Sequence, residues 1–386
     1  MTKNVKYLLA VAFCCLLSAS AFAWDFHVDS FYYNKTSENT VAVTFGEEKY
    51  KGDIVIPERI TVDGTEYQVT AIDSAAFRER MSSQNKITSV TLHSGIRRIG
   101  PCAFEQCWGL TAVTLPEGVE RVDSAAFCNC VNNKELSLPS TLKYIGPSAF
   151  DTNWLTTVTL PEGLEHIGCN AFVYNKLTEV VIPSTVSRID GGSFSGYENE
   201  LKTIRVADGN PYYHTTDGCG ELIETATNKL VQGTSHTVVP DYVTEIGAYA
   251  FDHCNIKELI LPASVSKIDY YALHTKEGIK NLYCFRDTPP ETDPCAFGTV
   301  ADGRRQLKGS ITLYVPKGSK EYYQDAPQWK DVKEIVEMNA ASIVAAEADK
   351  GTMRLYSPDG KQNRYPVKGL NIVRKSDGQS MKIMIK

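Results

Sequence analysis

Eleven cysteines are the side chains in this 386-residue sequence with the greatest capacity for chemistry, and their spacing favours a structural role. Cys107, Cys130 and Cys254 each stand three residues after a phenylalanine, where two other parts of the chain carry Asn153 and Asn175. A column of small residues that contact a neighbouring backbone accounts for this spacing, with each thiol behaving as a small apolar core residue. In an exported protein, Cys107 and Cys130 could instead form a disulfide. A zinc site is disfavoured, because no second cysteine pair stands at ligand spacing.

The other reactive side chains form no catalytic motif in the sequence. The seven histidines are scattered along the chain: His27, His93, His166, His214, His236, His253 and His274. There is no H-E-x-x-H, no G-x-S-x-G and no glycine-rich phosphate loop. We therefore predict no catalytic residue, no cofactor and no bound metal, and we do not expect an enzyme.

One residue pattern recurs along most of the chain, and the structure that it forms must position the cysteines and histidines. Its most regular member is an aromatic or aliphatic residue, here called the anchor: Phe77, Phe104, Phe127, Phe150, Phe172, Phe194, Phe251 and Leu273. Successive anchors are 27, 23, 23, 22, 22, 57 and 22 residues apart. Each follows an Ile or Val by five residues and another aliphatic residue by eight. A period of 22 to 23 residues is typical of leucine-rich repeats, in which each coil buries its apolar side only by stacking on its neighbours.

Each coil also carries a short predicted strand with the pattern L-x-x-V-x-L-P. In the copy from Leu110 to Pro116, alternation points Val113 and Leu115 inward and Thr114 outward. Strands of successive coils are expected to pair in register as a parallel sheet. The proline marks the point where each strand leaves the sheet, because it has no N–H to donate to the ladder.

The full pattern of L-x-x-V-x-L-P, then V-x-x-I-G-x-x-A-F, then Cys or Asn resembles the BspA-like branch of leucine-rich repeats, found in surface proteins of anaerobic oral and gut bacteria. The resemblance covers residues from about 54 to 336. It departs from the commoner leucine-rich repeat, whose ladder Asn or Cys follows the strand directly, because turn residues such as Gly118 stand there. The resemblance implies a right-handed solenoid, a secreted or surface location, and an adhesive or binding role.

These patterns predict a mainly β protein built as a leucine-rich-repeat solenoid. We expect a β-rich N-terminal cap with the first coil over 24–70, including a hairpin at Asp63-Gly64. The solenoid of 22–23-residue coils and its parallel sheet should follow over 71–336, with a hairpin insert at 207–236. A linker at 337–350 and a small C-terminal β module at 351–386 complete the predicted organisation.

Residues 1–23 have the features of a signal peptide. Lys3 and Lys6 precede an apolar run that is too short to span a bilayer, and Ala21-Phe22-Ala23 offers a small-x-small cleavage site. Removing this segment would change the net charge from −6 to −8, which disfavours nucleic acid and anionic membrane as partners. We expect a secreted or cell-surface monomer without a transmembrane segment.

The C-terminal segment 351–386 alternates apolar and polar residues between turns at Asp359-Gly360 and Asp377-Gly378. With its L-Y-x-x-D-G-K and G-L-N-I-V motifs, it resembles the C-terminal sorting domains that the type IX (Por) secretion apparatus reads. The resemblance implies export across the outer membrane and attachment there. The alternative is a plain β-rich terminal module.

The outward strand positions form the surface that the sequence offers to a partner. They are rich in threonine, which also suits a sheet for purely structural reasons. About ten coils, each rising about 4.8 Å, would give a face about 50 Å long, enough for a standard protein interface. We predict ligand contacts at Thr114, Thr159, Arg205 and Tyr283 on this face, and at Tyr212 and Tyr213 in the insert, where the aromatic pair could instead pack the insert onto the solenoid.

The function predicted from this surface is adhesion or protein binding, with a protein ligand on a host or bacterial surface. Glycan capture is the alternative, although the outward strand positions show no aromatic row on which sugars could stack. A hydrolase with its site in the insert, at Asp217 or His214, is the less favoured alternative.

Overall fold

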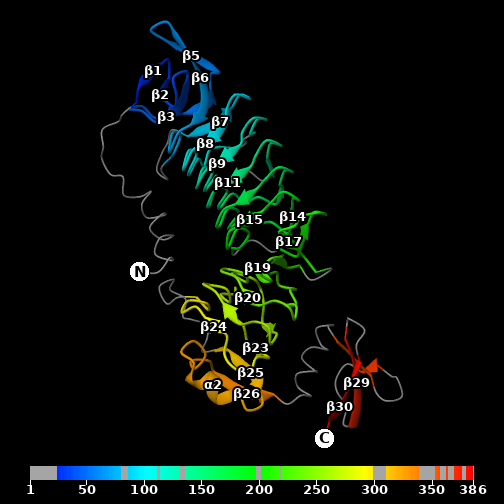
Figure 1. The fold of residues 1–386 in the computed structure, drawn as a ribbon. Helices are drawn as coiled ribbons and strands as arrows, with labels where there is room; N and C mark the ends of the chain where they lie inside the picture. The colour runs from blue at the N-terminus through cyan, green and yellow to red at the C-terminus, as the bar shows by residue number, and fades with distance from the viewer. Residues whose placement is uncertain are drawn as a thin grey trace.

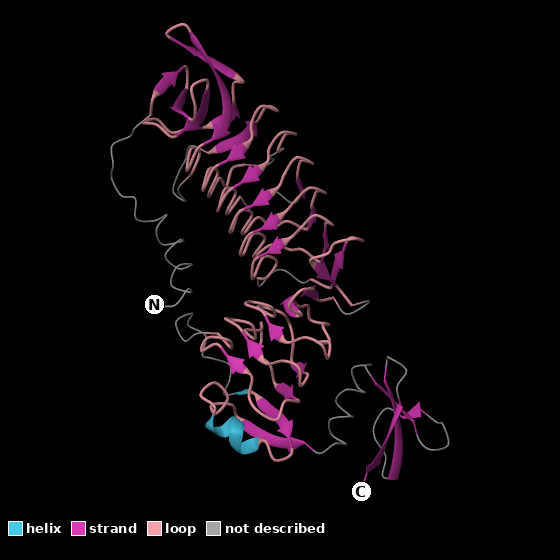
Figure 2. Ribbon diagram, in the orientation of Figure 1, coloured by secondary structure: helices cyan, strands magenta, loops and turns pink. Residues whose placement is uncertain are grey.

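The computed structural model is an elongated stack of coils made almost wholly of short strands and turns (Figures 1 and 2). It describes residues 24–79, 86–110, 114–130, 135–196, 201–216, 220–298, 310–338 and four strands between 353 and 385. The predicted signal peptide and most of the predicted linker lie outside this part. The mainly β solenoid with parallel sheets is confirmed. No helix in the described ranges is long and apolar enough to cross a bilayer.

A group of longer strands covers the N-terminal end of the stack. Strands β1 (Phe26–Val28), β2 (Phe31–Lys35) and β3 (Thr40–Thr44) pair antiparallel, and β3 then pairs parallel with β6 (Thr65–Ile72). Strand β5 (Arg59–Val62) forms with β6 the hairpin predicted at Asp63-Gly64, where both residues have positive φ. These strands cover the apolar edge of the first coil, which a terminal element of a solenoid must do.

The longest continuous sheet is built from two-residue strands at the Ile positions of the repeat. It runs from β6 through β8 (Arg98–Ile99), β9 (Arg121–Val122), β11 (Tyr144–Ile145), β13 (His166–Ile167) and β15 (Arg188–Ile189), all parallel. These short strands were not predicted from the sequence. A glycine follows several of these Ile residues because the next coil passes very close: a Cβ on Gly146 or Gly168 would lie 2.5–2.6 Å from backbone atoms of the neighbouring coil.

The L-x-x-V-x-L-P segments also form parallel pairs, as predicted, but in several separate sheets. In the first half of the stack the pairs are β4 (Gly52–Val55) with β7 (Ile87–Thr91), β10 (Glu135–Ser137) with β12 (Thr157–Thr159), and β14 (Glu179–Ile182) with β16 (Thr203–Val206). Each coil thus contributes one strand to each of two faces, and its apolar side chains fill the space between them.

The long interval between anchors contains three strands that join the two halves of the stack. Strands β17 (Tyr213–His214), β18 (Leu222–Glu224) and β19 (Lys229–Gln232) pair antiparallel, so the predicted hairpin is present as β18–β19. Strand β19 then pairs parallel with β20 (Glu245–Ile246), which puts Leu230 beside Ile246 in the Ile column. On β18, Leu222 packs in the first core and the adjacent Ile223 packs in the second.

The second half of the stack repeats the two-faced design and ends in a short helix. Strand β20 continues through β22 (Lys267–Ile268) to β24 (Glu291–Thr292), and on the other face β21 (Glu258–Leu261), β23 (Asn281–Cys284), β25 (Thr312–Pro316) and β26 (Glu334–Met338) pair parallel. Helix α2 (Lys320–Asp325) places Tyr323 against Trp329, with ring centroids 5.5 Å apart, and both rings are fully buried at the end of the core.

The C-terminal segment contains a four-stranded antiparallel sheet of its own. Its strands are β27 (Met353–Tyr356), β28 (Gln362–Asn363), β29 (Gly369–Lys375) and β30 (Ser380–Ile385), in the order β28-β27-β29-β30.

The anchor residues form a continuous stack of rings inside the first half of the solenoid. The stack runs through Phe77, Phe104, Phe127, Phe150, Phe172 and Phe194, with centroid distances of 5.1–5.6 Å and interplanar angles of 1–12°. All six rings are buried, as are the two aliphatic columns that precede them. The three predicted apolar columns are confirmed, and they are the main contact between coils.

The column three residues after the anchor ties neighbouring coils together through hydrogen bonds. Cys107 Sγ donates to Phe77 O, and Cys130 Sγ donates to Phe104 O at 3.1 Å. In the next coils, Asn153 Nδ2 donates to Phe127 O and Asn175 Nδ2 donates to Phe150 O, in the same geometry. The structural interpretation of this column is confirmed, and these thiols are free.

Candidate functional site

A row of exposed side chains crosses the first half of the solenoid on the L-x-x-V-x-L-P face. We call it the outer row: Val55, Thr91, Thr114, Ser137, Thr159, Val181 and Arg205. Register pairs Val55 with Thr91, Ser137 with Thr159 and Val181 with Arg205 across adjacent coils. Val55 is 63% exposed and Val181 46% exposed. Six of its seven members are uncharged, and the one charged member is Arg205.

Three of the predicted contact residues belong to the outer row. Thr114 and Thr159 are exposed near its centre, and Arg205 stands at its end, where its guanidinium lies 4.0 Å from the Glu179 carboxylate. Both of those charged groups are about two-thirds exposed, so the ion pair leaves the arginine available to a partner.

The fourth predicted residue of this face, Tyr283, lies in the second half of the solenoid. Its ring stacks on Tyr314 of the next strand at 4.6 Å and 14°, and both rings are half-buried. Ile260 pairs with Tyr283 on the other side. The expectation that the outward positions contain no aromatic row is therefore wrong at this end of the solenoid, because register places Tyr283 beside Tyr314 on adjacent strands.

The two predicted tyrosines of the insert have different environments. Tyr213 is 3% exposed, and its hydroxyl accepts a hydrogen bond from Ile189 N at 2.8 Å. This side chain packs the insert onto the solenoid and offers no surface to a ligand, which corrects its assignment as a ligand contact. Tyr212 is 48% exposed, and His214 contacts the Tyr242 hydroxyl at 3.1 Å. Asp217 lies outside the described residues.

A second row, which the sequence pattern did not predict, runs along the sheet from β8 to β15; its arginines are exposed and its two ring-bearing members are half-buried. It consists of the residue before each Ile or Val: Arg98, Arg121, Tyr144, His166 and Arg188. Arg121 lies over the Tyr144 ring at 3.6 Å, and Tyr144 meets His166 edge to face. The column is visible in the sequence once the Ile positions are known to be strands, because alternation then turns the preceding residue outward.

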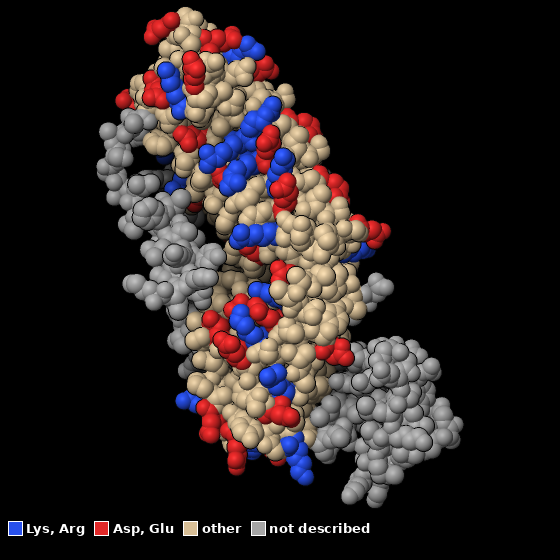
Figure 3. Space-filling model, in the orientation of Figure 1, with Lys and Arg blue, Asp and Glu red and all other residues tan. Residues whose placement is uncertain are grey.

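Acidic residues neutralise much of this second row. Arg98 and Arg121 both pair with Asp123, and His166 and Arg188 both pair with Asp190. Burial opposes the charge of Asp190, but its contacts with His166 and Arg188 hold its pKa below the ordinary value. Figure 3 shows basic and acidic side chains lying side by side along the described part of the solenoid.

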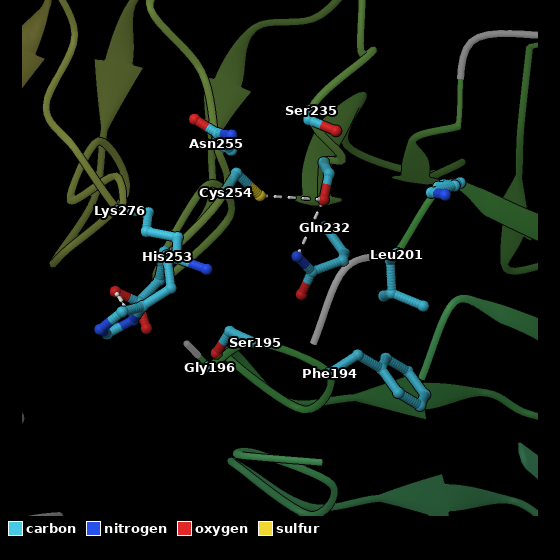
Figure 4. A pocket seen from close by; sticks show the side chains of 13 residues that line it. Phe194, Ser195, Gly196, Leu201, Gln232, Ser235, His253, Cys254, Asn255 and Lys276 are labelled. Carbon is cyan, nitrogen blue, oxygen red and sulfur yellow. Dashed lines mark hydrogen bonds and ion pairs between the residues drawn. The ribbon is translucent and has the colours of Figure 1, made fainter. Parts of the chain in front are cut away.

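A cavity of about 100 Å³ lies where the ring stack is interrupted, between the two halves of the solenoid (Figure 4). Phe194 ends the first stack, and Gly233 stands where the next anchor would be. The Phe251 ring fills the side-chain position of Gly233, since a Cβ there would lie 2.3 Å from a ring carbon. Gly233 O nevertheless accepts from Cys254 Sγ at 3.5 Å, as an anchor carbonyl does in other coils. Gly233 therefore stands at an anchor position without contributing a ring, and it lines the cavity together with Phe194.

Three ionisable side chains meet at one side of this cavity. Asp252 Oδ1 lies 2.6 Å from His274 Nδ1 and 2.9 Å from His253 Nδ1. The exposed fractions of these three side chains are only 8–10%. Burial opposes the charge of Asp252, but the two imidazoles together hold its pKa below the ordinary value. His253 stands two residues after its anchor, Phe251, and His274 stands one residue after its anchor, Leu273. Because these anchors belong to consecutive coils, stacking of the coils brings the two histidines close together, although they occupy different positions in the repeat.

The thiols near these surfaces have little reactivity. Burial raises the pKa of Cys130 and of Cys254 to about 12, so both remain protonated at neutral pH. Burial likewise raises the pKa of Cys107. These cysteines act as hydrogen-bond donors in the repeat column.

Comparison with known proteins agrees with this architecture. The chain matches the family model described as BspA type leucine-rich repeat region in six copies, over residues 70–200 and 229–292, which together make up half of the chain. No curated protein matches the chain.

Several solved structures share the fold at low sequence identity. A leucine-rich cell surface protein of Faecalibacterium prausnitzii is 23% identical with a TM-score of 0.55, over 84% of this chain and 97% of that protein. The pneumococcal vaccine antigen PcpA is 19% identical with a TM-score of 0.56, over 83% of this chain and 100% of that one. A leucine-rich repeat protein of Bacteroides ovatus is 22% identical with a TM-score of 0.50, over 82% and 77% of the two chains.

These similarities show that the chain shares the leucine-rich-repeat fold of these proteins. The repeated pattern, the stacked anchors and the family match lead to one conclusion: the chain belongs to the BspA-type leucine-rich repeat family.

Proposed function

We propose that this protein is displayed at or released from the cell surface and mediates adhesion by binding a protein partner along the outer row. The observation that carries the proposal is the composition of that row, in which six exposed uncharged side chains recur at one position of successive coils and the row ends at Arg205. Register is direct within three pairs of adjacent strands. The centre of a protein interface is depleted in charge and often contains arginine.

The dimensions of the outer row suit a protein ligand. Seven coils at about 4.8 Å give a row about 30 Å long, comparable with the width of a standard interface. Six of its seven side chains stand on paired strands, so this surface would lose little conformational freedom when a partner binds.

An adherence assay with matched variants tests this proposal. Beads carrying the full chain are incubated with epithelial cells and with bacterial cells, and bound cells are counted. Thr159→Arg places charge and bulk at the centre of the outer row and should reduce adherence at least about tenfold, a loss of about 1.4 kcal/mol. Ser187→Arg adds the same charge beside the second row and should leave adherence unchanged. Equal adherence of the two variants would remove the outer row from consideration.

Glycan capture is a second candidate, favoured by the stacked Tyr283–Tyr314 pair. Aromatic faces at 4.6 Å on neighbouring strands offer a small platform for a sugar ring. The same assay separates the two functions. Protease treatment of the target cells should abolish adherence that depends on a protein, whereas glycosidase treatment together with Tyr283→Ala should reduce adherence that depends on a glycan.

The C-terminal segment is proposed to direct export through the type IX apparatus. Its motifs support this assignment, and β27 to β30 form an antiparallel sheet of suitable size. In a bacterium with that apparatus, the full chain should reach the cell surface, whereas a chain lacking residues 351–386 should accumulate in the periplasm. Surface display of the truncated chain would refute the assignment.

A further inference from the structure

We propose that Asp252, His253 and His274 form a zinc-binding site between two neighbouring coils. Two imidazole nitrogens and one carboxylate oxygen are a donor set that zinc prefers, with bond lengths of about 2.0–2.2 Å. Each of the three residues offers one ligand atom, and these atoms lie within 4.8 Å of one another. Asp252 Oδ1 lies close to Nδ1 of both histidines.

The donor atoms must shift to hold an ion. Ligands of one tetrahedral zinc ion lie about 3.3 Å apart, given those bond lengths. Asp252 Oδ1 lies 2.6 and 2.9 Å from the two imidazole Nδ1 atoms, so it would move away from them by about 0.4 to 0.7 Å. The donor atoms of the two histidines, which lie within 4.8 Å of each other, would come to the same spacing of about 3.3 Å through side-chain rotation. Zinc would take the place of protons between them, and each neutral imidazole would carry its remaining proton on Nε2.

The backbone fixes the two histidines independently of any ion. His253 N donates to His274 O at 2.8 Å, which joins the two coils directly at the site. The imidazole planes of His253 and His274 are nearly perpendicular, with ring centroids 5.0 Å apart. Such positioning by the fold reduces the conformational entropy lost on binding, because the donor groups already converge.

The proposed site is mostly buried and opens onto the cavity at one side. All three side chains are about nine-tenths buried, which excludes most competing water. Asp252 and His253 line the cavity beside Phe194 and Ser195, so an ion can enter from there and a water molecule can occupy the fourth position. Three protein ligands with one open position are the usual arrangement in zinc sites that exchange a ligand.

Other coils place different residues at the same positions, so the cluster is not a general feature of the repeat. In the coil of Phe150, Asp151 and Thr152 stand where Asp252 and His253 do, and Val173 stands where His274 does. The complete donor set occurs in the coils that follow the missing ring. Zinc would connect two consecutive coils beside the cavity. Gly233 stands at the anchor position between Phe194 and Phe251, so its coil contributes no ring to the stack there.

Zinc titration of the purified full chain, stripped with a chelator, tests the proposal. We expect one zinc ion per chain with micromolar or tighter affinity, and a melting temperature that rises with zinc concentration because the ion binds only the folded state. His253→Asn and His274→Asn should weaken binding by more than the roughly 10- to 100-fold that loss of an outer-shell partner costs. His166→Asn, which removes a histidine paired with a single aspartate, should bind zinc like the wild type.

Cobalt substitution gives a readout that does not depend on comparing affinities. Co²⁺ in the wild-type site should show the strong visible absorption of a tetrahedral complex. His253→Asn and His274→Asn should lose this absorption, whereas His166→Asn should keep it. Absence of zinc binding by the wild type, or zinc binding by His253→Asn and His274→Asn as tight as that of the wild type, would overturn the proposal.

Discussion

The phenyl rings of Phe127 and Phe150 lie parallel, with centroids 5.6 Å apart and an interplanar angle of 1°. They belong to consecutive coils, and each ring covers the apolar face of the next. Because each coil contacts only its neighbours, the stability of the solenoid is approximately a sum of such interfaces. The predictions below test individual interfaces.

Replacing Phe150 should strongly destabilise the first half of the solenoid. Phe150→Ala removes a fully buried ring that contacts rings on both sides and should lower the free energy of unfolding by about 3–5 kcal/mol. Phe150→Leu should cost about 1.5 kcal/mol, since Leu273 occupies the same column in another coil. Urea denaturation followed by circular dichroism measures both. A loss below about 1 kcal/mol for Phe150→Ala would contradict a continuous stack.

Asn175 should contribute more to stability than a typical polar residue. Its Oδ1 accepts from Asn153 N and Leu155 N, and its Nδ2 donates to Phe150 O. Asn175→Ala leaves these buried groups without partners and should cost about 2–3 kcal/mol. Asn175→Cys should cost less, because Cys130 makes the equivalent donation to Phe104 O. Equal losses for the two variants would show that the donated bond contributes nothing.

Tyr213 should stabilise the junction between the two halves, whereas its neighbour Tyr212 should not. Tyr213→Phe removes the acceptor of the buried Ile189 N–H and should cost about 1–3 kcal/mol. Tyr212→Phe alters an exposed ring and should change stability by less than about 0.5 kcal/mol. Differential scanning calorimetry compares the two variants, and hydrogen exchange at Ile189 locates the effect. Unchanged exchange at Ile189 in Tyr213→Phe would refute this role.

Asp151 should make stability fall as pH rises through the mildly acidic range. Burial raises the pKa of its carboxyl to about 6, so the folded state resists its ionisation. The penalty is absent below the unfolded pKa of about 4, grows between pH 4 and 6, and is complete above that. Asp151→Asn should therefore be more stable than the wild type by about 1 kcal/mol at pH 7, after allowance for partial exposure, and equally stable at pH 3.5.

Unfolding of both proteins at a series of pH values measures this difference. Asp190 serves as the control with opposite sign, because ion pairing lowers the pKa of its carboxyl. Asp190→Asn should be less stable than the wild type at pH 7, and this loss should disappear as pH falls below the pKa of Asp190. A difference for Asp151→Asn that does not vary with pH would contradict the assignment.

The sequence by itself determined the repeat, its period and its three buried columns. The spacing of Phe127 and Phe150 specifies two positions in consecutive coils, and one-dimensional stacking converts equal positions into direct contacts. The Cys and Asn column followed for the same reason, because Cys130 and Asn153 occupy equivalent positions. The period of a repeat can be read from the order of the residues alone, without knowing which segments contact one another in the fold.

Only the tertiary structure decided what happens where the period fails. The sequence shows a 57-residue interval between anchors but not what fills it. The way in which strands β17 to β19 fold onto the stack places Gly233 at an anchor position and brings the Tyr213 hydroxyl to Ile189 N. The convergence of His253 and His274 on Asp252 likewise depends on the rotation of two consecutive turns. Spacing places residues in neighbouring coils, but side-chain direction is set by backbone torsions and packing, which the repeat pattern does not encode.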